Sequence, residues 1–260
     1  MFFDRIKQAL LQKDPAQKIQ MVNRLQSDVA NGELEFLAHE HIESIDVPGR
    51  PDKPELVHPS QVARRKLNSQ KGRIALIHAI CHIEFNAINL ALDAAYRFQQ
   101  MPRDYYLDWL QVAVEEARHF NLLTERLSQL GSYYGELSAH NGLWEMAQKT
   151  RHSLVERMAL VPRVLEARGL DVTPGMIERL RAVDDQQTVD ILEVILREEI
   201  GHVEVGTRWF RYACEQQQIN SESTFIALLR RYAVSADPAS MHVAARERAG
   251  FSKAELKALS

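Results

Sequence analysis

Two stretches of the sequence carry glutamate and histidine at the same spacing. Glu116 is followed three residues later by His119, and Glu199 is followed three residues later by His202. Both motifs lie in stretches with the apolar periodicity of a helix, in which residues i and i+3 share one face. A carboxylate and an imidazole on an apolar face need a partner. One metal centre bound by both motifs would meet that need.

The less specific interpretation of a Glu-x-x-His motif is a solvated pair on a helix surface. A single motif is most often such a pair, whereas two motifs on separate long apolar helices favour a common site. The neighbouring Glu115 and Glu198 are turned away from each motif by about 100° around the helix axis. We therefore expect these two side chains to lie outside the site.

A centre of this kind needs further carboxylates, and a third helical stretch supplies one at Glu84. Ile80 and Ala87, its neighbours at helical spacing, are apolar and would form part of the wall of a cavity. His78 and His82 belong to the same stretch but lack the motif spacing. We expect these two histidines to be core or supporting residues rather than ligands.

For the fourth carboxylate the sequence offers two candidates, Glu166 and Glu156. Glu84 precedes Glu116 by 32 residues and Glu166 precedes Glu199 by 33, so the two pairs resemble a repeat and favour Glu166. Glu156 shares its face with charged and polar residues, and we interpret that face as solvated. Glu156 stays the alternative if its helix ends soon after Glu166.

The predicted ligand set indicates the metal. Carboxylates and imidazoles suit iron or manganese, or a mixed pair of the two, better than copper(I). Cys81 and Cys214 are far apart and not in a C-x-x-C motif, which excludes a disulfide framework and an internal rubredoxin-type iron centre. Six protein ligands for two metal ions would leave open coordination positions, which the activation of dioxygen requires.

The candidate residues fall within long helical stretches. Periodicity predicts four long helices, at about 71–99, at 104–130, from about 141 onward, and at 187–218. We expect Asp104 to cap the second helix, Gly131 to follow its end, and Thr173-Pro174 to restart the third. No convincing strand is present. Long helices with short connections predict an all-α protein with an antiparallel four-helix bundle.

The sequence on either side of these helices is different in character. Residues 2–31 have helical periodicity, with a helix start at Asp14-Pro15. Residues 33–68 contain the proline-rich run VPGRPDKPELVHPS, which predicts an extended strap laid over the body. Residues 221–234 and 238–258 predict peripheral helices. The predicted domains are an N-terminal part at 1–68, the bundle at 69–220 and a C-terminal part at 221–260.

The overall composition is that of a globular protein. The 260 residues are 45% hydrophobic and carry a formal net charge of −3, so no basic field calls for nucleic acid or an anionic membrane. The first residues are too charged for a signal peptide, and no uninterrupted apolar run approaches the roughly 20 residues of a membrane span. We therefore expect a soluble, cytoplasmic protein.

Several of these stretches together resemble a known family. They are PGRPDKPELVHPS, GRIALIHAICHIEFNAINLALDAAYRF, VEEARHFNLL, LVPRVLEARGLDVTP and LREEIGHV. They are similar to the DUF455 family of ferritin-like proteins over about residues 20–218. The runs LEARG and EEARH also resemble the diiron tRNA hydroxylases of the MiaE type, more distantly. The resemblance implies a ferritin-like bundle and a dimetal site with the ligands Glu84, Glu116, His119, Glu166, Glu199 and His202.

Three classes of function fit these features. The favoured class is a di-iron oxidase or hydroxylase acting on a small or medium organic substrate with an external electron donor. The second is a ferroxidase, an iron-handling protein or a peroxide scavenger, and the third is a helical interaction protein with structural metal. No catalytic side chain beyond the ligands is assigned. The MiaE resemblance leaves tRNA open as a partner, and the sequence leaves a homodimer open.

Overall fold

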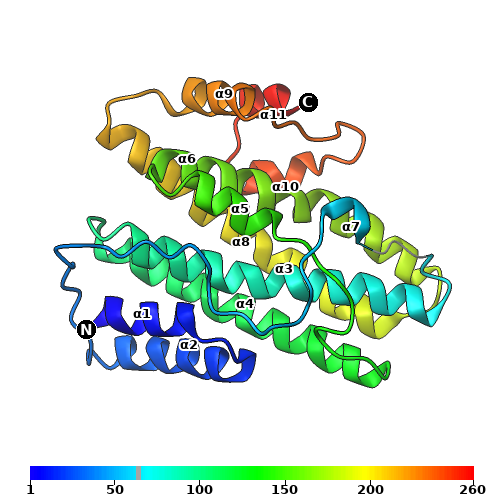
Figure 1. Cartoon of the computed structure of the whole chain (residues 1–260). Coiled ribbons are helices and arrows are strands. Elements are labelled where there is room, and N and C mark those ends of the chain that lie inside the picture. The colour runs from blue at the N-terminus through cyan, green and yellow to red at the C-terminus, as the bar shows by residue number, and fades with distance from the viewer. Residues whose placement is uncertain (63–65) are drawn as a thin grey trace. The chain divides into compact units, whose positions relative to one another are not determined.

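The computed structural model describes residues 1–62 and 66–260, and most of these residues are helical (Figure 1). The α-helices are α1 Phe2–Leu11, α2 Pro15–Ala30, α3 Gln70–Arg97, α4 Arg103–Gln129, α5 Gly142–Lys149, α6 Leu154–Leu160, α7 Ala167–Arg181, α8 Gln186–Gln216, α9 Ser221–Arg231, α10 Val243–Arg248 and α11 Lys253–Leu259. A 3₁₀-helix, η1, spans Pro59–Gln61, and a π-helix, η2, spans Val161–Glu166. The described residues contain no strand, which confirms the all-α class.

The chain folds as two compact units, Met1–Trp144 and Glu145–Ser260. In the first unit α3 packs along α4, while α1 contacts α3 and α2 contacts α4. In the second unit α8 contacts α6, η2, α7, α9 and α10. The first unit therefore contains the helices predicted at 71–99 and 104–130. The second contains the helix predicted at 187–218 and nearly all of the stretch predicted to be helical from about residue 141. The predicted domain boundaries after residues 68 and 220 stay a prediction.

The ends of α3 and α4 lie within two residues of their predicted positions. The side chain of Ser69 caps α3 by accepting a hydrogen bond from the backbone N–H of Gly72. The predicted cap at Asp104 is wrong, because Pro102 is the capping residue of α4 and Asp104 lies in its first turn. An acid in that turn still complements the positive end of the helix. Gly131 follows α4 with a φ of 75°, a conformation that favours glycine.

The third predicted helix is the one that differs most from expectation. It is interrupted after α5, and the chain from Leu154 to Arg181 is then helical without a break through α6, η2 and α7. The predicted restart at Thr173-Pro174 is wrong, because Pro174 lies inside α7. Leu170 and Ile177, on either side of this proline, are buried, so packing maintains the helix where a backbone hydrogen bond is lost.

The C-terminal part forms shorter helices than predicted. Helix α9 lies within the helix predicted at 221–234. The region predicted as one helix at 238–258 instead contains two short helices, α10 and α11. A turn at Ala249 and Gly250 separates α10 from α11, and the side chain of Phe251, directly after this turn, is buried. Phe225 of α9 and Leu259 of α11 are buried as well. This part of the chain therefore contributes to the core of the second unit.

The segment after α2 is extended, as its prolines predict, and is held by hydrogen bonds to the first unit. Gly49 donates its N–H to the carbonyl of Leu10 in α1 at 2.8 Å. Farther along, Val57 donates to the carbonyl of Ala139 at 2.8 Å, next to an isolated bridge between Leu56 and Ala139. Residues 63–65 of the predicted strap lie outside the described residues.

Among the described helices, α3 is long and apolar enough to cross a membrane by length and composition. Of its most apolar 18-residue window, 72% is buried inside the structure. The core helix of a soluble protein has the same properties, and α3 packs against both α1 and α4. Its apolar character therefore fits a buried helix of a soluble protein.

A buried lysine joins α1, α2 and α3. The ammonium group of Lys18 donates hydrogen bonds to the carbonyls of Ala9 and Leu10 at 2.9 Å and to the amide oxygen of Asn89 at 2.7 Å. These carbonyls belong to the last turn of α1, and each also accepts a backbone N–H, that of Gln12 at 3.3 Å for Ala9 and that of Gly49 at 2.8 Å for Leu10. Burial lowers the pKa of Lys18 to about 7.

This lowered pKa predicts a pH dependence of stability. Between pH 7 and pH 10.5 the unfolded chain keeps a proton on Lys18 that the folded chain has released, so stability rises with pH. We expect the difference in unfolding free energy between the unaltered protein and Lys18→Met to increase by about 2 to 3 kcal/mol from pH 6 to pH 9. Urea unfolding of both proteins at the two pH values measures this. A difference that stays constant or decreases would contradict the assignment.

Candidate metal centre

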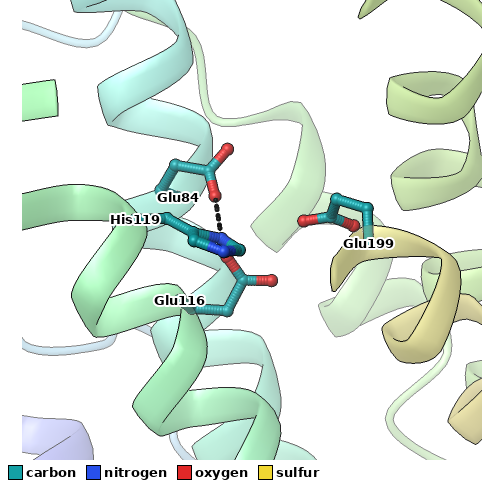
Figure 2. A group of neighbouring side chains, drawn as sticks. All are labelled: Glu84, Glu116, His119 and Glu199. Atoms are coloured by element: carbon teal, nitrogen blue, oxygen red, sulfur yellow. Dashed lines mark hydrogen bonds and ion pairs between the residues drawn. The ribbon is translucent and has the colours of Figure 1, made fainter. Parts of the chain in front are cut away.

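Helices α3 and α4 bring three of the predicted ligands together inside the first unit. Figure 2 shows Glu84 of α3 pointing toward Glu116 and His119 of α4; it also draws Glu199, which belongs to the second unit. The Nδ1 atom of His119 lies 3.1 Å from Oε2 of Glu84 and 3.4 Å from Oε2 of Glu116. All three side chains are buried, and their ligand atoms lie within 4.8 Å of one another. This buried cluster of carboxylates and imidazole could bind a metal ion.

The helical repeat explains why these three side chains meet. Glu116 and His119 are one turn apart on α4, on the same face as the buried Val112 and Leu123. On α3, Glu84 lies one turn from Ile80, which is also buried. The apolar periodicity that packs α3 on α4 therefore directs the polar ligands into the same interface.

The charge state of His119 follows from its neighbours. Burial by itself lowers the pKa of this ring, but the hydrogen bonds and negative charges of Glu116 and Glu84 outweigh burial and raise the pKa to about 11. In the metal-free protein the ring is therefore an imidazolium at neutral pH. Its Nδ1 proton occupies the space between two carboxylates that a metal ion would fill, so metal binding has to displace that proton.

The two histidines of α3, His78 and His82, have hydrogen-bond partners in the loop after α4. Nε2 of His78 accepts a hydrogen bond from the N–H of Gly135 at 2.9 Å, and Nδ1 of His82 lies 2.9 Å from the hydroxyl of Tyr134. Burial lowers the pKa of His82 to about 4, which keeps the ring neutral. These histidines hold the loop after α4 against α3. Tyr134 of that loop packs edge-on against Phe120, the residue after His119.

The cysteine of α3 is a protonated thiol in the metal-free protein. Cys81 lies one turn before Glu84 on α3 and is fully buried. Burial, and then the charge of Glu84, raise the pKa of this thiol well above its usual value of 9.0. The candidate ligands that the first unit groups together are carboxylates and an imidazole. Such groups fit iron or manganese.

The second Glu-x-x-His motif has the same local geometry as the first. In α8 the Nδ1 atom of His202 lies 3.5 Å from Oε1 of Glu199, close to the 3.4 Å between Nδ1 of His119 and Glu116. Both residues of the α8 motif are buried. In each unit, then, one helix turn presents a carboxylate and the Nδ1 atom of an imidazole on a buried face.

The two candidates for the fourth carboxylate have different surroundings. Glu156 is buried, and its carboxylate accepts hydrogen bonds from Arg231 at 2.8 Å and from the hydroxyl of Tyr232. The expectation that this face is solvated is therefore wrong, because α9 covers it. Glu166 is the last residue of η2, and the helix continues beyond it through α7.

A π-helix separates the two candidates. Arg163 lies two turns after Glu156, and both side chains contact the C-terminal part, Arg163 through Glu255 and Glu156 through Arg231. The wider turns of a π-helix insert about one extra residue and change the register of the helix beyond them. Glu166, at the end of η2, therefore does not keep the spacing to Glu156 that a regular helix would give.

Six residues were predicted as ligands, and the structure groups five of them within their own units. Glu84, Glu116 and His119 form the cluster of the first unit, and Glu199 and His202 form the pair of the second. The assignment of Glu166 to the same site stays a prediction. The sequence indicated neither the π-helix nor the buried partners of Arg163, although Pro162 in a helical stretch signals an irregular turn.

The fold and the clusters define a helical protein with buried carboxylate and histidine groups that could bind metal ions. The chain belongs to a family described as "Protein of unknown function (DUF455)", whose model matches residues 11–257. It is 41% identical over 266 residues to an uncharacterized protein of Haemophilus influenzae, an alignment that covers 98% of this chain and 92% of that protein. No solved structure matches the chain.

The raised pKa of His119 gives a direct prediction for the metal-free protein. At pH 8 we expect NMR of ¹⁵N-labelled histidine to show both ring nitrogens of His119 protonated, and His82 neutral as an internal control. Addition of Zn²⁺ should convert His119 to the neutral form, because a ring nitrogen must lose its proton to bind a metal. A neutral His119 at pH 8 before metal is added would contradict the charge state assigned to this ring.

Proposed function

We propose that this chain is a ferritin-like dimetal carboxylate protein in which the two clusters form one centre. Its ligands would be Glu84, Glu116, His119, Glu166, Glu199 and His202. The observation that carries the proposal is the buried cluster of Glu84, Glu116 and His119, together with the same motif geometry at Glu199 and His202. One carboxylate from each of two helices, and a Glu-x-x-His from each of two others, is the ligand pattern of ferritin-like dimetal proteins.

Charge supports two metal ions rather than one. The four carboxylates, three of them buried and that of Glu166 half-buried, would carry four negative charges, which two divalent cations neutralise. Without metal, the imidazolium of His119 offsets only part of the charge of Glu84 and Glu116. Unpaired carboxylates in an apolar interior are costly, so the metal ions would also stabilise the folded chain.

The reaction class we propose is oxidation or hydroxylation of an organic substrate. Bound iron or manganese would supply one-electron chemistry and open positions for dioxygen. The protein would hold the metal ligands in fixed positions and exclude water with buried apolar side chains. Those side chains include Ile80, Ala87, Leu123 and Val203, each buried beside a predicted ligand.

The architecture favours an enzyme over a storage protein. The extended segment over the first unit and the C-terminal helices of the second exceed what a minimal storage bundle needs. A small or medium organic substrate and an external electron donor are the partners that this reaction class requires. Nucleic acid is not the expected substrate, although the resemblance to MiaE-type hydroxylases does not exclude tRNA. A cytoplasmic location fits the same proposal.

Iron loading with dioxygen tests the proposal and separates it from iron storage. Fe²⁺ is added to the metal-free full-length protein, dioxygen is admitted, and bound and oxidised iron are counted per chain. We expect two irons per chain that are oxidised once and cycle again only with a reductant and an organic substrate. Many irons retained per chain as mineral would show storage, and no bound iron would contradict the proposal.

The same iron-loading experiment, carried out on two variants of neighbouring glutamates, tests whether Glu116 is a ligand. Glu116→Ala removes a ligand and should lower iron binding at least ten-fold, while circular dichroism shows unchanged helicity because packing holds α4. Glu115→Ala removes the neighbouring acid, whose carboxylate accepts a hydrogen bond from Gln111 at 2.7 Å, and should leave iron binding unchanged. Equal iron binding by the two variants would exclude Glu116 as a ligand.

A further inference from the structure

Arg163 of the π-helix is fully buried and connects several elements of the second unit. Its Nη2 atom lies 2.8 Å from Oε2 of Glu255 in α11, and its Nε–H donates a hydrogen bond to the hydroxyl of Thr207 in α8 at 3.2 Å. Its guanidinium carbon lies within 4.8 Å of the ring centres of three aromatic residues, Phe210, Phe225 and Phe251. Faces of aromatic rings attract such a cation.

The acid that pairs with Arg163 is itself fixed in place. Glu255 is buried, and its Oε2 atom accepts a hydrogen bond from the N–H of Ser252 at 2.8 Å. In return, the hydroxyl of Ser252 accepts from the N–H of Glu255 at 3.1 Å, which completes a capping box at the start of α11. The carboxylate of Glu255 thus takes part in the cap at the start of α11 and also pairs with the guanidinium of Arg163. The orientation of Arg163 therefore depends on the C-terminal helix.

The backbone around Arg163 is also closely held. Pro162 precedes it and packs so tightly on Gly206 of α8 that a Cβ atom at Gly206 would lie 2.4 Å from the Pro162 ring. Because proline has no N–H to donate, the regular hydrogen bonding of the helix is interrupted at this turn. Pro162 and Arg163 together fix the wide turn that ends at Glu166.

We propose that Arg163, through its ion pair with Glu255, is a positioning residue that holds the π-helix and so orients Glu166 toward the metal ions. This inference rests on the proposed function, because it requires Glu166 to be a ligand. The C-terminal helices α9 and α11 would then determine metal binding without contributing a ligand. Their aromatic residues and Glu255 keep Arg163, and with it the turn before Glu166, in one orientation.

A second buried ion pair provides a matched control. Arg246 of α10 lies 2.7 Å from Oδ2 of Asp171 in α7, and both residues are buried. This pair also joins the C-terminal part to the helix that carries Glu166. Asp171 lies in the regular part of that helix, beyond the π-helix. Arg246 also donates a hydrogen bond to the carbonyl of Ala167, directly after Glu166, at 3.3 Å, so the control keeps Arg246 and changes Asp171 alone. Loss of the Asp171 charge should weaken the fold without removing this contact.

The experiment compares two variants of the full-length, metal-free protein by titration with Co²⁺, followed by visible absorption. Arg163→Met with Glu255→Gln removes both charges of the pair, so that neither charge is left buried alone, and glutamine can keep the capping box. Asp171→Asn is the control, in which Arg246 keeps its hydrogen bond to the carbonyl of Ala167. Thermal unfolding followed by circular dichroism establishes that each variant is folded at the titration temperature. If the first variant does not fold, Glu255→Gln alone takes its place.

We expect the unaltered protein and the control to bind two Co²⁺ per chain with the same spectrum. The Arg163 variant should bind one of the two ions at least ten-fold more weakly, with an altered spectrum. Unchanged binding by the Arg163 variant, or equal losses in both variants, would overturn the positioning role and leave the metal site in place. An unaltered chain that binds no Co²⁺ would overturn the proposed function and this inference with it.

Discussion

The ring of His119 between the carboxylates of Glu84 and Glu116 is the interaction on which the first unit depends. Two carboxylates buried 3.1 and 3.4 Å from one ring nitrogen need positive charge, and the ring supplies it as an imidazolium when no metal is bound. A helix pair can bury such a group only if the rest of its interface is apolar and closely packed. The long apolar faces of α3 and α4 meet that condition.

Other polar side chains in the interior are also paired with groups that complement their charge. Lys18 is paired with backbone carbonyls, and Arg163 and Arg246 are each paired with a buried acid. Lys18 joins α2 to α3, Arg163 joins the π-helix to α11, and Arg246 joins α10 to α7. The N-terminal and C-terminal helices are therefore attached through specific polar contacts as well as through apolar packing. We expect such contacts to favour one arrangement of these helices over others of similar apolar burial.

Much of this structure could be predicted from the sequence because helical periodicity is local. The two Glu-x-x-His motifs, Glu84 and the ends of α3, α4 and α8 all follow from residue spacing within one helix. Periodicity shows which residues share a face, but it does not show which distant segment covers that face. For this reason periodicity alone predicts a solvated face at Glu156, although Arg231 and Tyr232 cover it. Periodicity does not predict the π-helix either, because the π-helix depends on the contacts of Pro162 and Arg163 with distant residues.

The central claim is that one centre with two metal ions uses ligands from both units. Anomalous X-ray diffraction at the iron edge, from crystals of the iron-loaded protein, tests it most directly. We predict two peaks per chain, separated by roughly 3.5–4 Å, with Glu84, Glu116, His119, Glu166, Glu199 and His202 as the ligands. Glu156 in place of Glu166 would correct the fourth carboxylate alone. A single peak bound by one motif, or two peaks more than about 10 Å apart, would contradict the shared centre.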